Sequence, residues 1–327
     1  MPRKIWVIAT SWGSGAGRTK ERNLEMALGL LDEAAAVRPD LVCLPEEFPL
    51  IGTPRDERPD LLEPIPGPVF DALAERARRY GTCVVAGLGE HRDGRRHNTA
   101  VLIDRQGRLA GRYAKVRATD YEIAAGVVPG GEIPVFETDF GRLGIQICYD
   151  IGWPANWDHL GAQGAELVAW PSAYDGGFPL QAYAWRNQYY VVSSVWSHFA
   201  RVIDITGRIL ARTTRQTRLV AQQIDLEKTL FHTDNNLGKL PAIRRRLGRD
   251  VEVVQYSDEN YFTLESHRPE WPVARIAREY EMETFRAYHA RATRVQDEAR
   301  GGPIAVAGMD GVEGRHRQPR PGSQQPA

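Results

Sequence analysis

Cys148 is the residue whose type and position most directly indicate chemistry. It stands in the middle of residues 142–157, just after a run in which apolar residues alternate with Gly144 and Gln146 in the period-two pattern of a strand. The pattern predicts a strand over 143–149, with the thiol at its carboxyl end, where α/β proteins gather their sites. Free cysteines are more often buried hydrophobes. A catalytic role therefore requires a base and a group that stabilises an oxyanion.

Two other predicted strand ends carry candidates for these partners. Glu46 and Glu47 follow a short apolar run that Pro45 terminates, and Lys115 follows a predicted hairpin. A glutamate can accept the proton of a thiol and return it to a leaving amine, while a lysine stabilises the tetrahedral oxyanion. The chemistry indicated is acyl transfer from an amide-like carbon, and these residues leave open which glutamate is the base.

The remaining cysteines and the histidines argue against other thiol chemistry. The eight histidines show no Cys-His pattern of the papain or caspase type, which disfavours a cysteine protease. Cys43, Cys83 and Cys148 are widely spaced, so neither a disulfide framework nor a zinc site is expected. Cys43 and Cys83 lie inside apolar runs and are expected in the core.

Bulk composition narrows the class of partner. The chain has 327 residues, 42% of them hydrophobic, and its 42 Lys plus Arg balance 42 Asp plus Glu. Because the charges balance, the chain has no net positive charge that would attract nucleic acid or an anionic membrane surface. No apolar run approaches the roughly 20 residues that span a bilayer, and no signal peptide is indicated. We expect a cytoplasmic protein that binds a small molecule, without nucleic-acid or membrane partners.

Hydrophobic periodicity predicts two similar halves. The first half is expected to contain a strand over 4–9, a helix over 19–38, a helix over 68–80 and a hairpin over 98–113. The second half is expected to contain strands over 143–149, 166–170 and 190–196, a helix over 179–189, a hairpin about 205–208, and a strand over 218–225 that closes its sheet. Because the central strands are apolar on both sides, we expect one α/β domain with two mixed sheets face to face and outer helices.

The character of the chain changes after this region. Residues 226–300 read as a C-terminal arm of the same domain, with a polar segment and then a helix over about 271–294. The arm is expected to cover either a neighbouring subunit or its own domain. Residues 301–327 are rich in Gly, Pro, Gln and Arg and are expected to be disordered.

Three ordered motifs carry a resemblance to a known family. They are Leu44-Pro45-Glu46, Tyr113-Ala114-Lys115 and the segment from Gly141 to Asp150 that contains Cys148. Asn98-Thr-Ala-Val is a supporting match. In this order, over residues 4–225, the chain resembles the nitrilase or carbon-nitrogen hydrolase superfamily.

The resemblance implies a fold and a set of roles. The fold is a four-layer αββα sandwich, which pairs into homodimers or larger homo-oligomers, and no cofactor or metal is implied. The implied Glu-Lys-Cys triad has Glu46 as general base and acid, Lys115 as electrophilic support and Cys148 as nucleophile. The backbone N–H of Tyr149 is the implied second oxyanion donor, and Glu122 matches an auxiliary glutamate.

Residues after the nucleophile indicate the branch. True nitrilases commonly continue with Trp-Glu, whereas this chain has Tyr149-Asp150, similar to amide- and carbamoyl-cleaving branches. We therefore expect hydrolysis of a small linear amide or N-carbamoyl compound through a thioester. Nitrile hydrolysis, acyl transfer and a non-catalytic role on this fold are the alternatives. D-amino-acid carbamoylases hold the substrate carboxylate with arginines where this chain has Ile151 and Gly152, so such a substrate needs another cation.

Substrate contacts are less well indicated. Tryptophans near strand ends could line an apolar substrate pocket, namely Trp153, Trp157 and Trp170. Ser172, Ala173 and Tyr174 could contact the amide. Core packing or a subunit interface is the favoured explanation of these residues.

Overall fold

The computed structural model describes residues 3–13 and 19–304, and two six-stranded mixed sheets form the larger part of it. The first sheet has the order β12-β1-β2-β3-β4-β5, with β1 (Lys4–Thr10), β2 (Leu41–Cys43), β3 (Cys83–Arg92), β4 (Arg95–Ile103), β5 (Leu109–Ala114) and β12 (Leu219–Asp225). The second has the order β11-β10-β9-β8-β7-β6, with β6 (Val135–Glu137), β7 (Arg142–Ile145), β8 (Leu167–Ser172), β9 (Tyr190–Val195), β10 (Arg201–Ile203) and β11 (Ile209–Arg212).

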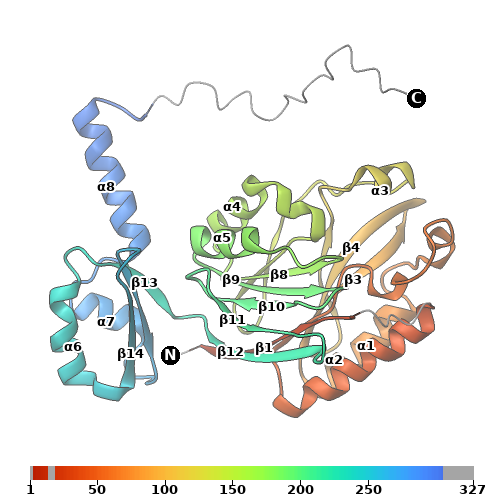
Figure 1. The fold of residues 1–327 in the computed structure, drawn as a ribbon, viewed down its shortest axis with the longest axis horizontal. Coiled ribbons are helices and arrows are strands. Elements are labelled where there is room, and N and C mark those ends of the chain that lie inside the picture. Colours follow the sequence, from red (N-terminus) through yellow and green to blue (C-terminus); the bar gives the residue numbers. More distant parts are fainter. Residues whose placement is uncertain (1–2, 14–18, 305–327) are drawn as a thin grey trace, which may run out of the picture.

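The sheets lie face to face, with helices on their outer sides (Figure 1). Helices α1 (Lys20–Ala34) and α2 (Pro68–Tyr80) cover the first sheet, and α4 (Pro154–Ala162) and α5 (Phe178–Asn187) cover the second. Alternation along β1 produces this layering: Val7 and Ala9 join a core cluster with residues of the second sheet, whereas Ile8 packs with the outer helices. The predicted four-layer αββα sandwich is confirmed.

The residues expected to begin and end the first two helices are found at those positions. The Thr19 side chain caps α1 by accepting a hydrogen bond from the N–H of Arg22. Helix α2 begins with Pro68 and ends at Gly81, which adopts a left-handed φ of 62°. Leu73 of this helix is fully buried against the sheet, which stabilises the packing by about 1.5–3 kcal/mol.

One sheet assignment made from the sequence is wrong. The strand predicted over 218–225 does not close the second sheet, because β12 pairs antiparallel with β1 of the first sheet, from Lys4 with Asp225 to Thr10 with Leu219. In the same way β6, the last strand before the second half begins, pairs with β7 of the second sheet. The last strand of each half therefore lies in the sheet of the other half. Periodicity predicts a strand but does not select its partner.

Residues after 226 form a small unit of their own. Strands β13 (Thr229–His232), β15 (Tyr261–Ser266) and β14 (Val251–Tyr256) make a three-stranded sheet, which α6 (Leu240–Leu247) and α7 (Val273–Glu279) accompany. Sequence analysis did not anticipate this sheet. Its core includes Phe231 and Phe262, stacked with ring centroids 5.5 Å apart.

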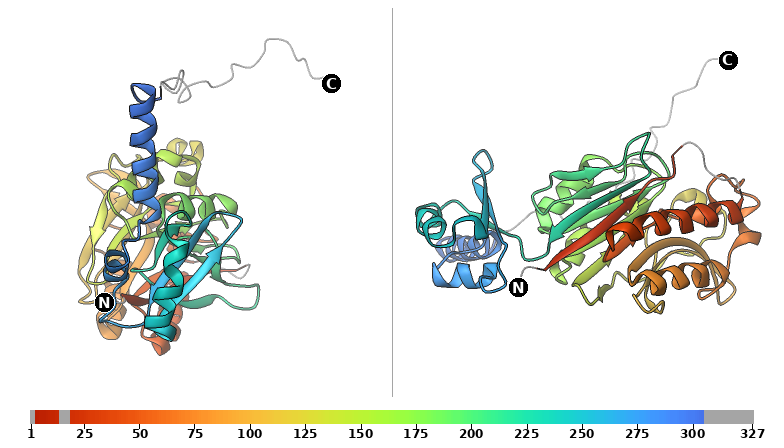
Figure 2. Two further views of the ribbon diagram at one scale, coloured as in Figure 1. Left: turned by 90° about the vertical axis from the view of Figure 1, so that its left-hand side faces the viewer. Right: turned by 90° about the horizontal axis from the view of Figure 1, so that it is seen from below.

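Ion pairs join the small unit to the sandwich, including Lys4 with Glu265 at 3.1 Å. Helix α8 (Phe285–Arg300), described in full, projects away from the rest and buries none of its residues (Figures 1 and 2). That this arm covers a neighbouring subunit stays a prediction. Of the tail expected to be disordered, residues 305–327 lie outside the described residues.

Across residues 3–13 and 19–304, no helix combines the length and apolar character that crossing a membrane requires.

Candidate active site

The segment that carries Glu46 crosses directly over strand β3. Leu44 donates its N–H to the carbonyl of Val85 at 2.8 Å, and the N–H of Gly87 reaches the carbonyl of Pro45 at 3.2 Å. A Cβ atom on Gly87 would lie 2.5 Å from the Cα atom of Glu46, so only glycine permits this approach. The backbone of Glu46 is thereby fixed, and its side chain is 4% exposed.

Lys115 is held on both sides of the chain as it leaves β5. Its N–H donates to the carbonyl of Asn98 at 2.8 Å, and its own carbonyl accepts from Gly130 at 2.9 Å. A Cβ atom on Gly130 would meet the carbonyl oxygen of Ala114 at 2.2 Å. The lysine side chain is 2% exposed, which is rare for this residue type unless it is paired.

A compact network of charges surrounds the Lys115 ammonium. Its Nζ atom lies 2.8 Å from Glu46 Oε1 and 2.8 Å from Glu122 Oε2. Asn98 joins the same carboxylates, with its Nδ2 atom 2.8 Å from an oxygen of each. In the sequence, Asn98 was only part of a supporting match to the family. The structure places it between the two glutamates.

Glu122 lies on the short helix α3 (Asp120–Ala124), whose capping box fixes its direction. The carboxylate accepts a hydrogen bond from the N–H of Thr119 at 2.7 Å, and the Thr119 side chain accepts from the N–H of Glu122. Burial raises the pKa of Glu122, but Lys115 and these hydrogen bonds outweigh it and lower the pKa below its usual value. Glu122 is therefore an anion at neutral pH.

The same charges keep Lys115 protonated. Burial alone lowers its pKa, but the carboxylates of Glu46 and Glu122 raise it above the usual value. Lys115 acts as a fixed cation and not as a base.

Cys148 does not continue a strand, contrary to the predicted span of 143–149. Strand β7 ends at Ile145, and Cys148 opens a 3-10 helix (Cys148–Gly152) with a positive φ of 42°. The Asp150 carboxylate causes the turn by accepting a hydrogen bond from the N–H of Ile147 at 2.8 Å. The thiol is 8% exposed. Burial and then the charge of Glu46 raise the pKa of Cys148, so the resting group is a thiol.

Asp150 also ties the nucleophile turn to the segment that carries Lys115. The buried carboxylate accepts hydrogen bonds from the hydroxyl of Tyr113 at 2.8 Å and from the N–H of Arg117 at 2.9 Å. Burial raises its pKa to about 6. From the sequence, Asp150 indicated only the branch of the family. In the structure, its hydrogen bonds connect the segments that carry Cys148 and Lys115.

Glu47, the alternative base, points elsewhere. Its backbone is left-handed (φ 37°), and its nearest cation is Arg58, with 3.6 Å between Oε2 and Nη1. Burial and the charge of Glu46 raise its pKa to about 7. Lys115 hydrogen-bonds to Glu46 and not to Glu47, which favours Glu46 as the base.

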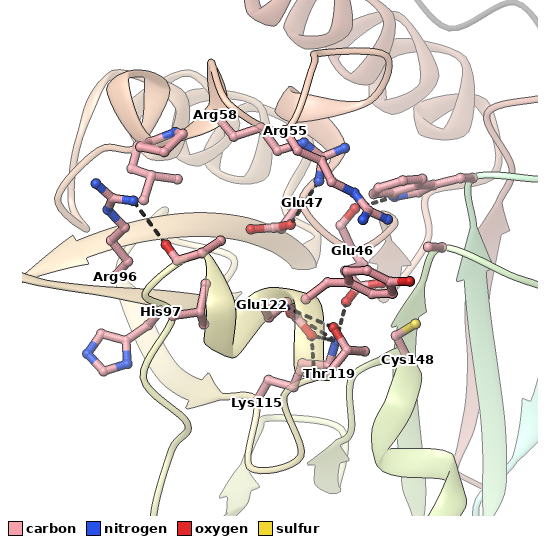
Figure 3. A pocket seen from close by; sticks show the side chains of 17 residues that line it. Glu46, Glu47, Arg55, Arg58, Arg96, His97, Lys115, Thr119, Glu122 and Cys148 are labelled. Atoms are coloured by element: carbon pink, nitrogen blue, oxygen red, sulfur yellow. Dashed lines mark hydrogen bonds and ion pairs between the residues drawn. The ribbon is translucent and has the colours of Figure 1, made fainter.

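Glu46, Lys115, Glu122 and Cys148 open into one cavity of about 230 Å³ (Figure 3). The cavity is also lined by Glu47, Arg55, Arg58, Pro59, Leu62, Arg96, His97, Thr119, Tyr121, Ala125, Val127, Ala173 and Trp196. His97 lies across the view from Cys148, and its Nδ1 atom is 2.8 Å from the carbonyl oxygen of Val128 (Figure 3).

Of the predicted substrate contacts, Ala173 lines the cavity. Ser172 is buried and hydrogen-bonds the backbone of Tyr174, and neither residue is among those lining the cavity. Trp153 packs against the exposed ring of Tyr149 at 5.1 Å. The roles predicted for these residues stay predictions.

Trp157, Trp170 and the other two cysteines belong to the core. Trp157 is fully buried and stacks on Tyr183 at 4.7 Å, and Trp170 is also fully buried. Cys43 and Cys83 are buried as expected. Within the described ranges, no group of His, Cys, Asp and Glu side chains is placed to hold a metal ion.

Comparison with known proteins agrees with this geometry. The carbon-nitrogen hydrolase family matches residues 13–230. Omega-amidase NIT2 of Xenopus tropicalis is 26% identical over 237 residues, 64% of this chain and 84% of that protein. Deaminated glutathione amidase of Synechocystis sp. is 30% identical over 239 residues, 63% of this chain and 87% of that protein. The crystal structure of the Caenorhabditis elegans NitFhit protein shares the fold, with a TM-score of 0.62 and 24% identity over 74% of this chain and 63% of that one.

The chain belongs to the carbon-nitrogen hydrolase family. The predicted superfamily is therefore confirmed, as is the prediction of a thiol-dependent enzyme that hydrolyses carbon–nitrogen bonds. The similar proteins reported above carry amidase names, in line with the predicted amide branch.

Proposed function

We propose that the protein hydrolyses the C–N bond of a small linear amide through a thioester on Cys148. The observation that carries this proposal is the convergence of Cys148 with the network of Lys115, Glu46 and Glu122 on one cavity. A resting thiol requires a base at the moment of attack, and a buried carboxylate held beside a fixed ammonium meets that requirement. The amidase names of the similar proteins support the choice of an amide.

The first half-reaction forms the thioester. Cys148 Sγ attacks the carbonyl carbon while Glu46 takes the thiol proton, and the carbonyl oxygen becomes an oxyanion. The Lys115 ammonium and the Tyr149 N–H stabilise that charge. Tyr149 lies at the start of a 3-10 helix, where N–H groups have no acceptor within the helix. Glu46 then passes its proton to the leaving nitrogen, the C–N bond breaks, and ammonia or an amine departs.

The second half-reaction regenerates the thiol. Water attacks the thioester carbon, Glu46 takes a proton from the water, and the C–S bond breaks. The proton returns to sulfur and the carboxylic acid leaves. Glu122 keeps Lys115 in place throughout through its paired oxygens.

Product analysis separates this function from the alternatives. Purified protein is incubated with amides, N-carbamoyl compounds and nitriles, first in water and then with an added amine. We expect release of ammonia and a carboxylic acid from an amide, and loss of turnover in Cys148→Ala and Glu46→Gln. Turnover of nitriles alone, or products formed only with the added amine, would reject amide hydrolysis.

Assembly and location belong to the same proposal. Phe178 and Trp185 of α5 are 75% and 46% exposed, which supports the predicted homodimer or larger homo-oligomer. Cytoplasmic location agrees with three reduced cysteines. Sedimentation of the purified full-length chain tests the subunit number.

A further inference from the structure

Glu46 and Glu122 differ in how their carboxylate oxygens are used. Both oxygens of Glu122 accept hydrogen bonds, Oε1 from Asn98 and Lys115, and Oε2 from Lys115 and the N–H of Thr119. On Glu46 both donors converge on Oε1, because Lys115 Nζ and Asn98 Nδ2 each lie 2.8 Å from it. Among the described residues, Oε2 of Glu46 accepts no hydrogen bond. Of these four oxygens, it is the one left to take the proton of the thiol.

All three N–H groups of the Lys115 ammonium are engaged with carboxylates (Figure 3). The hydrogen bonds measure 2.8 Å to Glu46 Oε1, 2.8 Å to Glu122 Oε2 and 3.0 Å to Glu122 Oε1. Stabilising an oxyanion therefore requires that one N–H be shared with it. The longest bond is the one that can be shared, because Glu122 Oε1 also accepts from Asn98 at 2.8 Å and stays hydrogen-bonded.

Asn98 contributes its two amide hydrogens to this arrangement. The side chain lies on β4 and is 1% exposed, and its Nδ2 atom serves one oxygen of each glutamate. Its Oδ1 atom is buried and has no hydrogen-bond partner among the described residues, which costs stability. Asn98 is not among the residues that line the cavity, so its effect on the reaction has to pass through Glu46 and Lys115.

We propose that Asn98 is a positioning residue for both carboxylates. It holds Glu46 with Oε2 free to take the thiol proton, and it keeps Glu122 hydrogen-bonded while Lys115 shares an N–H with the oxyanion. This inference rests on the proposed function. Asparagine suits the place because its amide donates twice and adds no charge where two carboxylates already face one ammonium.

Asn98→Leu keeps much of the volume and removes both donors. The pH profile of kcat/KM, with an amide that the native protein hydrolyses, reports the base of the free enzyme in its acid limb. A carboxylate that loses a donor holds its proton to higher pH, so the limb should move up by about 1–2 pH units. On the plateau above the limb, kcat should stay roughly 10- to 100-fold lower with KM nearly unchanged, because Lys115 is then less free to serve the oxyanion.

Other ionisable groups around Glu46 do not account for such a shift. They are Glu47, Lys115, Glu122, Cys148 and Tyr174. The Asn98 side chain hydrogen-bonds only the two glutamates Glu46 and Glu122 among the described residues, and Asn98→Leu adds no charge. Glu47, with a pKa of about 7, should titrate alike in both proteins.

Asn187→Leu is the matched control, because Asn187 is also a buried asparagine that donates to a carboxylate, Asp158 at 3.2 Å, and does not line the cavity. It should lower stability but leave the acid limb in place. If Asn98→Leu does not fold, Asn98→Asp keeps the shape of the side chain and sets a third carboxylate against two others, which should move the limb in the same direction. An unmoved limb in a folded Asn98 variant would overturn the positioning role, because partial unfolding lowers the rate by the same factor at every pH.

Denaturant unfolding separates this failure from failure of the proposed function. Burial raises the pKa of Glu122, but Lys115, Thr119 and Asn98 together lower it below its usual value. A group with a lowered folded-state pKa stabilises the fold at higher pH and loses that contribution as pH falls through the folded-state pKa. The stability lost in Asn98→Leu should therefore be largest near pH 7 and shrink as pH falls towards about 4.

That trend, in a protein that hydrolyses no amide, would retain the hold of Asn98 on the carboxylates and reject amide hydrolysis. Hydrolysis with an unmoved limb and a loss of stability that is equal at both pH values would retain the hydrolase and reject the positioning role.

Discussion

Replacing Lys115 by methionine should separate its structural from its chemical contribution. Methionine keeps much of the apolar volume but removes the ammonium that lies 2.8 Å from each of two carboxylates. Removing one partner of a buried ion pair typically costs about 3–5 kcal/mol, because it leaves an uncompensated charge. We expect a free energy of unfolding lower by that amount at slightly alkaline pH, together with loss of hydrolysis.

The loss of stability in Lys115→Met should depend on pH, and the pKa of Glu122 sets the direction of that dependence. With Lys115 present, the pKa of Glu122 is lowered. Without the ammonium, burial and the charge of Glu46 should raise the pKa of Glu122 above its value in the unfolded chain. A group with a raised folded-state pKa stabilises the fold at low pH and loses that contribution as pH rises through the folded-state pKa. The deficit of Lys115→Met should therefore grow with pH, by up to about 1.4 kcal/mol per pH unit for one proton.

Denaturant unfolding of both proteins between about pH 5 and pH 8 measures this deficit. Adding Glu122→Gln to Lys115→Met should reduce it, because only one carboxylate then remains. Lys228→Met is the matched control, since Lys228 pairs with one buried carboxylate, Asp204, at 3.2 Å and does not line the cavity. It should lose stability but retain activity. A deficit for Lys115→Met that does not change with pH would show that Glu122 does not become an uncompensated buried charge when the ammonium is removed.

Three further predictions concern the residues that place the nucleophile and the base. Asp150→Asn replaces an acceptor that faces two backbone N–H groups and a tyrosine hydroxyl, so denaturation should show a loss of about 1–3 kcal/mol, and kcat should fall more than KM changes. Gly87→Ala forces a Cβ atom against Glu46 and should lower kcat, whereas Gly29→Ala, with open space around it, should stabilise helix α1 by up to about 1 kcal/mol. Burial raises the pKa of Cys148, so its alkylation by iodoacetamide should still accelerate above about pH 9, while a plateau near the usual thiol pKa of about 8.5 would contradict this.

Much of the secondary structure can be predicted from local sequence patterns. Helix α2 begins and ends where Pro68 and Gly81 indicate, because both residues act on their own backbone. The ordered motifs also indicated Glu46, Lys115 and Cys148, and the resemblance that they carry implied Glu122. The fold brings all four residues to one cavity.

The connections across the site could not be predicted in this way. Asn98 bridges Glu46, 52 positions away, and Glu122, 24 positions away, and only the folded sheet brings them together. The alternating pattern through Ile147 predicts a longer strand than exists. Alternation alone does not show that the Asp150 carboxylate accepts a hydrogen bond from the N–H of Ile147 and that the backbone turns at Cys148. The exchange of β6 and β12 between sheets has the same origin, since partner choice depends on the packed halves.

The thioester on Cys148 is tested most directly by mass spectrometry of the intact protein, quenched rapidly during turnover of a slowly hydrolysed amide. We expect a mass increase equal to the acyl group of the substrate, mapped to Cys148 and absent in Cys148→Ala. Hydrolysis without any adduct on Cys148, or an adduct on another residue, would contradict it.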